Sequence, residues 1–232
     1  MKNTKHLVLG LGQIGSAIRD ILDADCIDLW ADKSSFEERN YEALHICFSY
    51  EESFNEIVQK YQSRFSPIIT IIHSTVPIGT SERLSAVHSP CRGIHPNLKA
   101  GIMTFVKYFG GEKAEEAALH FHNCGIKTHT CALARDTEAM KLWDTTIYGW
   151  NIILEKMIFT YCKENNLDFD LIYTKANESY NDGYEKLGHP EYKKYILRHI
   201  DGKIGGHCVI DNLELLDSEV ASIIKKFNEK LV

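Results

Sequence analysis

Short apolar runs alternate with helical periodicity in the first half of the chain. Strand-like runs occupy 6–10, 26–30, 44–48 and 67–73, and the stretches 51–61 and 80–87 have the apolar spacing of helices. Further strand candidates are 93–95, 104–109 and 125–131, with a helix expected at 112–123. Strands that alternate with helices predict a parallel sheet covered by crossover helices. We therefore expect an α/β fold, a doubly wound parallel sheet, over residues 1–131.

One long helical segment dominates the second half. Residues 136–165 contain no proline and a single glycine, Gly149, which permits one helix of about 25 to 30 residues. Its apolar residues cover more than one face, so several faces have to be buried. We expect a smaller all-α domain over 132–232 and a homodimer that packs on this helix. Shorter helices are expected at 168–175, at 191–198 and from 212 to the end, with a polar loop at 181–183.

Composition narrows the possible partners and the compartment. With 44% hydrophobic and 25% charged residues, the 232-residue chain has the composition of a soluble globular protein. Its net charge of −6 comes without a basic run, so we expect no nucleic-acid partner. No window approaches the roughly 20 apolar residues that a membrane-spanning helix needs, so no membrane partner is expected. Seven irregularly spaced cysteines favour free thiols in a reducing compartment, which we interpret as the cytoplasm.

A glycine-rich turn between the first strand and the first helix carries a nucleotide-binding pattern. It consists of Gly10, Gly12 and Gly15, with Gln13 and Ile14 between the last two. The first glycine allows a tight turn, the second lets backbone approach a pyrophosphate, and the third lets the helix lie on the strand. The helix N-terminus then attracts the anion. This context predicts a Rossmann-type domain that binds NAD; glycines that serve only a tight turn are the alternative.

Asp32, near the end of the second strand, bears on which dinucleotide is bound. It follows Gly12 by the spacing at which a carboxylate accepts hydrogen bonds from the ribose hydroxyls and repels a 2′-phosphate. NAD is therefore favoured as the cofactor. Lys33, Ser34 and Ser35 leave NADP open, because the same turn could hold a phosphate. A solvated turn carboxylate is the other interpretation of Asp32.

The segment 74–80, STVPIGT, follows the fourth strand, at the edge where doubly wound sheets bind ligands. We expect Ser74, Thr75 and Val76 to line the cofactor site. The segment resembles the corresponding loop of the UDP-glucose/GDP-mannose dehydrogenase family, relatives of 6-phosphogluconate dehydrogenase. Three further stretches follow in that family's order: PNLKAG at 96–101 ahead of FGG at 109–111, EAMK at 138–141, and GGHC at 205–208.

The resemblance implies a reaction and roles for three residues. In the family an alcohol is oxidised to an aldehyde, a cysteine adds to form a thiohemiacetal, a second hydride leaves to NAD, and water releases the acid. Cys208 matches that cysteine, and its place after two glycines near a helix start would stabilise a thiolate. Lys141 would be the hydrogen-bond donor or general base at the reacting oxygen, with Glu138 orienting it. A buried cysteine, a solvated lysine and a helix-terminal carboxylate are the alternatives.

The sequence also departs from the family. The family has a glutamate where Asn97 stands, an asparagine where Thr145 stands and an aspartate where Asn212 stands. Amides cannot take a proton from water as carboxylates do. The chain also ends at Val232, where the family begins a third domain that binds the nucleotide of its sugar substrate. A dinucleotide-binding sensor or partner subunit is therefore the competing hypothesis, and a single-step oxidoreductase that uses Lys141 alone is a third.

Histidines and cysteines cluster late in the first half. Five zinc-compatible side chains lie within twelve residues, but their spacing matches no usual ligand pattern. They are His120, His122, Cys124, His129 and Cys131. We expect them to pack and expect no metal. We likewise interpret His45 and His73, on predicted strands, as core residues.

Overall fold

The computed structural model describes residues 5–30, 34–93, 96–205 and 208–231. The chain forms two compact units, Met1–Lys141 and Leu142–Val232. The division falls inside helix α6 (Ala134–Glu164), because the first turns of that helix are hydrogen-bonded to the sheet unit. Over the described residues, each helix is too short or too polar to cross a bilayer.

The first unit is built on a seven-stranded sheet in the order β2-β1-β3-β4-β5-β6-β7. Neighbouring strands run parallel except at β5 and β6, which are antiparallel. The strands are β1 (His6–Leu9), β2 (Asp25–Ile27), β3 (Ala43–Ile46), β4 (Ile69–Ile72), β5 (Val87–His88), β6 (Lys107–Gly110) and β7 (Thr128–Cys131). This arrangement confirms the doubly wound α/β fold predicted from the alternating pattern.

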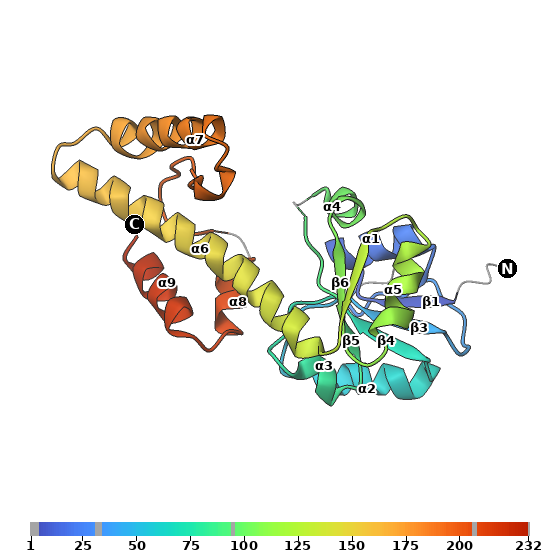
Figure 1. Cartoon of the computed structure of the whole chain (residues 1–232). Helices are drawn as coiled ribbons and strands as arrows, with labels where there is room; N and C mark the ends of the chain where they lie inside the picture. The colour runs from blue at the N-terminus through green and yellow to red at the C-terminus, as the bar shows by residue number, and fades with distance from the viewer. Residues whose placement is uncertain (1–4, 31–33, 94–95, 206–207, 232) are drawn as a thin grey trace. The chain divides into compact units, whose positions relative to one another are not determined.

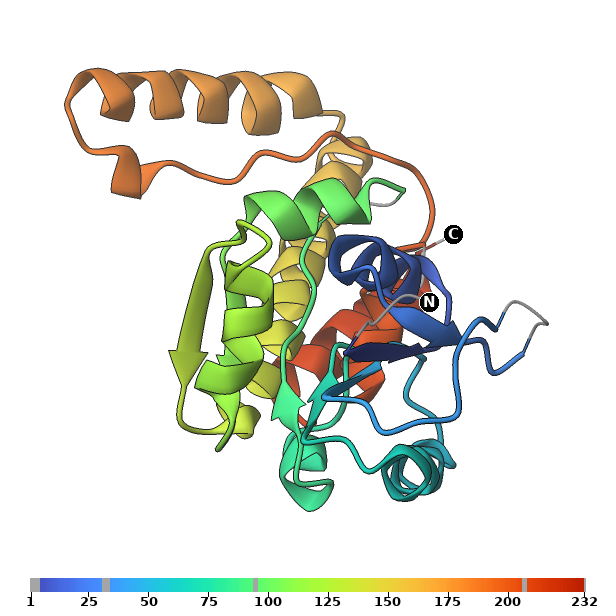
Figure 2. The same ribbon diagram turned by 90° about the vertical axis from the view of Figure 1, so that its right-hand side faces the viewer.

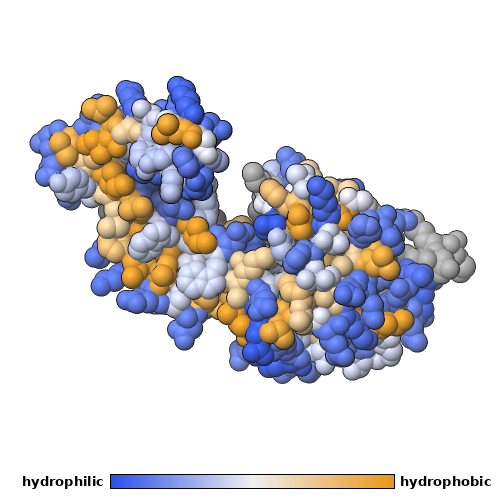
Figure 3. Space-filling view, in the orientation of Figure 1, coloured by the Kyte–Doolittle hydropathy of each residue, from blue (hydrophilic) through white to orange (hydrophobic). Residues whose placement is uncertain are grey.

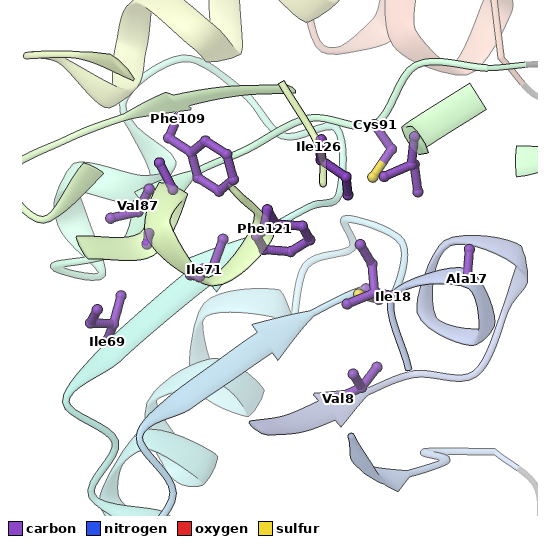
Figure 4. Packing of buried hydrophobic residues seen from close by; sticks show 14 of the residues in the cluster. Val8, Ala17, Ile18, Ile69, Ile71, Val87, Cys91, Phe109, Phe121 and Ile126 are labelled. Atoms are coloured by element: carbon purple, nitrogen blue, oxygen red, sulfur yellow. The ribbon is translucent and has the colours of Figure 1, made fainter. Parts of the chain in front are cut away.

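Helices cover both faces of the sheet (Figures 1 and 2). One face carries α1 (Gln13–Leu22), α4 (Leu98–Thr104) and α5 (Ala114–His122), and the other carries α2 (Phe54–Phe65). A buried cluster that includes Val8, Ile71, Phe109, Phe121 and Ile126 fills the first interface (Figure 4). Strands buried on both faces appear in the sequence as continuous apolar runs, which is why β1, β3 and β4 were predictable.

The second unit is helical. After α6 the chain forms a π-helical stretch, Asp170–Lys175, and continues into α7 (Ala176–Lys186), then α8 (Ile210–Glu214) and α9 (Glu219–Lys230). Ile153, Val209 and Ile224 belong to its core. Gly149 is required in α6 because an added Cβ would lie 2.8 Å from Val209 Cγ1. The smaller all-α domain built on a long helix is thus confirmed.

Two expectations for the second unit are wrong. Residues 181–183 lie within α7 and not in a loop, and 191–198 forms a short 3₁₀ turn, Pro190–Tyr192, followed by irregular chain. Side-chain contacts explain the second difference. Asn181 bonds the backbone N and O of Lys194, and the Tyr173 hydroxyl accepts from Leu197 N. Backbone groups of Lys194 and Leu197 therefore find hydrogen-bond partners on neighbouring helical residues, and the 191–198 stretch does not need a helix of its own.

Three further elements also differ from those expected. The expected helix at 80–87 is only α3 (Thr80–Arg83), and the stretch ends in β5. Gly93 has a φ of +150° and lies outside any strand, while 94–95 fall outside the described residues. The expected last helix is divided into α8 and α9, because Ser218 starts a new helix by accepting a hydrogen bond from Ala221 N.

Candidate functional site

The glycine turn joins β1 to α1, and Gly10 and Gly15 occupy positions that other residues would not tolerate. Gly10 has a φ of +85°, and a Cβ on Gly15 would lie 1.7 Å from the Gly10 carbonyl oxygen. A Cβ on Gly12 would meet nothing within 4 Å, so open space lies in front of the helix start. Gln13 is exposed there, and Ile14 is half-buried against the core. The backbone amides at the start of α1 border this space, which fits the requirements of a bound pyrophosphate.

The edge beyond β2 is described only in part. Asp32 lies outside the described residues. Asp28 follows β2 directly, and its Oδ1 accepts a hydrogen bond of 3.1 Å from Trp30 N. The sequence analysis did not select Asp28; its position immediately after a buried strand is the signal that would have found it. Asp28 therefore places a carboxylate at the end of β2.

The 74–80 segment meets the glycine turn at Phe48. The Ser74 hydroxyl donates to the Phe48 carbonyl over 2.5 Å, and a Cβ on Gly10 would lie 3.0 Å from Phe48 Cβ. Thr75 is half-buried, whereas Val76 is fully buried in the core. Ser74 therefore uses its hydroxyl to join the ends of β3 and β4, and this segment offers a ligand mainly its backbone and Thr75.

Glu138 connects α6 to the same segment. Its carboxylate is fully buried and accepts hydrogen bonds from Gly79 N at 2.5 Å and Ser81 N at 2.8 Å. Gly79 has a φ of +88° and precedes α3, so the carboxylate satisfies amides that this helix start leaves unpaired. Both oxygens are used on backbone, which makes Glu138 a positioning residue for the segment.

His88 and Thr137, which the sequence analysis missed, reinforce that connection. His88 Nε2 lies 3.2 Å from the Ser74 carbonyl, and its Nδ1 lies 2.9 Å from Thr137 Oγ1. Complete burial lowers the pKa of His88 to about 3, so the ring is neutral at physiological pH. A neutral ring that donates from Nε2 accepts at Nδ1, which matches the two partners.

Two lysines hold the chain that leaves β5. Lys141 Nζ donates to the Cys91 carbonyl over 3.1 Å. Lys107 Nζ, on β6, donates to the Ser89 carbonyl over 3.0 Å and approaches the Pro90 carbonyl at 3.5 Å. Lys107 is almost completely buried, and desolvation lowers its pKa. The sequence analysis missed it; a lysine inside an otherwise apolar strand was the available signal.

Three histidines form a row across the central strands, in which His45 and His73 are buried and His6 is half-buried. His6 Nδ1 lies 3.1 Å from His45 Nε2, His45 Nδ1 lies 3.0 Å from His73 Nε2, and His73 Nδ1 lies 2.8 Å from the Ser89 carbonyl. Desolvation lowers the pKa of all three, to about 4 for His6. Neutral rings that each donate from Nδ1 satisfy this whole row.

The expected catalytic residues divide between the units. Lys141 and Glu138 belong to the first unit, whereas Cys208 belongs to the second, where it is exposed and lies just before α8. Near it in sequence, Asn212 donates from Nδ2 to Thr145 Oγ1 over 3.2 Å. Asn97 precedes α4 in the first unit without a side-chain capping bond.

The histidine and cysteine cluster around α5 makes packing contacts. The His120 ring lies edge-on to His6, the Cys124 thiol faces the Ile21 carbonyl at 3.6 Å, and His129 packs beside Tyr108. Within the described ranges, no group of three His, Cys, Asp or Glu side chains is arranged to hold a metal ion.

Comparisons with known proteins agree with the fold. No family model and no curated protein matches the sequence. Among solved structures, the UDP-D-ManNAc dehydrogenase of Pyrococcus horikoshii is similar over 97% of this chain and 68% of its own, at 16% identity and a TM-score of 0.76. The UDP-glucose dehydrogenase of Pyrobaculum islandicum is similar over 99% and 70%, at 14% identity and a TM-score of 0.70.

A shorter enzyme is similar along nearly its whole length. The 3-hydroxyisobutyrate dehydrogenase of Mycobacterium tuberculosis is similar over 98% of this chain and 93% of its own, at 14% identity and a TM-score of 0.66. These likenesses show a Rossmann-like dehydrogenase fold followed by a helical region.

Proposed function

We propose that the protein is an NAD-dependent dehydrogenase that oxidises an alcohol group of a sugar nucleotide or a related hydroxy compound. The observation that carries the proposal is the glycine turn, with open space at Gly12 and forced close packing at Gly15. The names of the structural neighbours supply the substrate classes, sugar nucleotides and small hydroxy acids. We infer a cytoplasmic enzyme with a small-molecule substrate and without nucleic-acid or membrane partners.

Each unit has a task in this proposal. Bound NAD would supply a hydride acceptor. The amides that open α1 bind its pyrophosphate, and Asp32 binds its ribose and disfavours NADP. Lys141, held at the Cys91 carbonyl, donates a hydrogen bond to the reacting oxygen or takes its proton. The Cys208 thiol would add to the aldehyde product, loss of a second hydride to NAD would convert the thiohemiacetal to a thioester, and water would release the acid and the free thiol.

We also propose a homodimer that packs on α6. Large apolar side chains remain exposed along this helix, among them Trp143, Ile147, Trp150, Leu154 and Met157. Figure 3 shows hydrophobic residues grouped over the second unit. A contiguous apolar surface of this kind is typical of an interface between subunits. A second copy would bury the faces that this unit leaves uncovered.

A binding protein without full catalysis is the second candidate. Thr145 and Asn212 bond each other, and neither side chain can act as a carboxylate base. A dinucleotide-binding sensor or a partner subunit would tolerate this pairing. Reactivity of Cys208 distinguishes the candidates: an activated nucleophile reacts with an alkylating reagent faster than an ordinary exposed cysteine at neutral pH.

Binding and turnover test the proposal separately. Calorimetry with NAD and NADP measures cofactor binding, and Asp32→Asn is expected to weaken NAD binding more than Asp28→Asn does. NADH formation is then followed over a panel of hydroxy acids and nucleotide sugars, with wild type, Cys208→Ser and Lys141→Met. Binding without turnover of any substrate would support the binding protein, and absence of binding would refute both candidates.

A further inference from the structure

A lysine amine and a cysteine thiol lie together in the core of the first unit. Lys107 Nζ is 3.5 Å from Cys91 Sγ, and the two residues are only 4% and 5% exposed. Lys107 enters from β6, and Cys91 enters from the chain that follows β5. Figure 4 shows Cys91 within the buried cluster. No role in the proposed dehydrogenase reaction uses either side chain.

The surroundings hold the amine in place and disfavour its charge. Its other neighbours are the Ser89 and Pro90 carbonyls and the rings of Phe109 and Phe121, whose centroids lie 5.6 and 5.2 Å from Nζ. Desolvation lowers the pKa of Lys107, which enlarges the neutral share of the amine. A neutral amine is a nucleophile, whereas an ammonium is not.

A small pocket reaches both groups. Its lining includes Cys91, Lys107, Pro90 and Phe105. Its volume of about 10 Å³ is close to the minimum that one water molecule requires. A small oxidant such as hydrogen peroxide is therefore the kind of reagent that can approach the thiol when the pocket opens slightly, and larger reagents are excluded.

We propose that Cys91 and Lys107 form an oxidative modification site, in which peroxide converts the pair into a covalent sulfur–nitrogen link. The Cys91 thiol first attacks peroxide, so that the sulfur is oxidised by two electrons to a sulfenic acid and one oxygen leaves as water. The Lys107 amine then attacks that sulfur. An S–N bond forms, the S–O bond breaks, and the sulfenic oxygen leaves as a second water with a proton from the amine.

The link would join β6 to the chain that follows β5, where the Cys91 carbonyl accepts a hydrogen bond from Lys141. Cys91 provides the carbonyl that accepts from Lys141, so a covalent bond at its side chain restrains the backbone at that position. Once the chain is digested, a low-molecular-weight thiol reverses the link, because a thiolate attacks the sulfur and releases the amine. The site would thus make this part of the first unit responsive to peroxide.

Peptide mapping of the peroxide-treated full chain tests the site directly. Wild-type protein is treated with hydrogen peroxide, digested without reductant and analysed by mass spectrometry. We expect a cross-linked pair of peptides containing Cys91 and Lys107, about 2 Da lighter than their sum, that disappears after treatment with a thiol. Cys162, which is 1% exposed and lies in the second unit, serves as the internal control and stays unlinked to lysine.

Variants separate the link from simple oxidation. Cys91→Ser and Lys107→Met should both lose the cross-linked peptide, and Lys107→Met should leave Cys91 as a sulfenic acid or as a mixed disulfide. The wild-type map decides the question even when Lys107→Met does not fold. The proposal is overturned if wild-type Cys91 stays reduced, is oxidised while Lys107 remains a free amine, or pairs with Cys47 as a disulfide.

Discussion

Asn212 donates a hydrogen bond from Nδ2 to Oγ1 of Thr145 over 3.2 Å, although the two residues are 67 positions apart. Both lie in the second unit, on α8 and α6. They are also two of the positions where the sequence departs from the dehydrogenase family that it resembles. The two departures therefore form a mutually bonded pair, an amide and a hydroxyl where a carboxylate and an amide are expected.

This pair predicts a slow hydrolytic step. Asn212→Asp should place a carboxylate near Cys208 in sequence and raise the rate of acyl-enzyme hydrolysis by at least about tenfold, because a positioned general base contributes about 10² to 10⁴. Rapid mixing that separates the first NADH burst from steady turnover measures the change. Asn212→Ala, which removes the bond without adding a base, is the control; an equal gain in both variants would contradict the role of the carboxylate.

The glycine turn predicts different outcomes for two similar substitutions. Gly15→Ala forces a Cβ against the Gly10 carbonyl and should cost about 3 kcal/mol of unfolding free energy. Gly12→Ala places its methyl in open space, so the fold should survive while NAD affinity falls about tenfold or more. Denaturant titration and calorimetry measure the two effects. Gly183→Ala, on exposed helix α7, should stabilise by about 0.5 to 1 kcal/mol as the control.

Glu138 should matter for stability more than an exposed carboxylate does. Glu138→Gln retains the shape but weakens the bonds from Gly79 N and Ser81 N, and we expect a loss of about 1 to 3 kcal/mol. Glu82→Gln breaks an exposed ion pair with Arg135, which solvent screens, and should cost less than Glu138→Gln. Urea unfolding of both variants compares them. Equal losses would show that burial of Glu138 has no energetic consequence.

Four histidines that are buried or half-buried predict that the protein loses stability in mild acid. His6, His45, His73 and His88 have pKa values lowered by desolvation, so below their ordinary value of 6.5 the unfolded chain binds protons that the native chain does not. Unfolding free energy should therefore fall as pH drops from about 6.5 toward 4, where His6 titrates, and further toward 3, where His88 titrates. Each histidine contributes up to about 1.4 kcal/mol per pH unit.

Denaturant titrations between pH 7.5 and 4.5 measure that dependence. The prediction fails if stability is constant or rises as the pH is lowered. Nitrogen NMR of the imidazoles supplies an independent check, since His6, His45 and His73 should all carry their proton on Nδ1.

The proposed interface on α6 predicts that one charge introduced into it will convert the dimer to a monomer. Ile147→Glu introduces a carboxylate at a position that is 60% exposed in one chain and buried in the proposed dimer. Sedimentation should then report the monomer mass at concentrations where wild type is dimeric. Ile68→Glu, at 62% exposure in the first unit, is the matched control and should leave the assembly intact.

The parts of this protein that could be predicted are those that depend on neighbours along the chain. Continuous apolar runs marked β1, β3 and β4, and the spacing of Gly10, Gly12 and Gly15 located the nucleotide turn, because both signals are local. The two-residue strand β5 gave too short a pattern to detect. The expected helix at 191–198 failed because distant side chains, Asn181 and Tyr173, satisfy its backbone.

The amino-acid sequence by itself therefore determined the doubly wound sheet, the glycine turn and the long helix, since each follows from periodicity or local backbone requirements. Only the tertiary structure decided that Glu138 holds the 74–80 segment, that His45 and His73 share a hydrogen-bonded row, and that Lys107 meets Cys91. Those contacts depend on strand register and on how helices cross the sheet. Strand register and helix crossing bring together residues that are far apart in the sequence, and nothing in the sequence around them indicates that they will be neighbours.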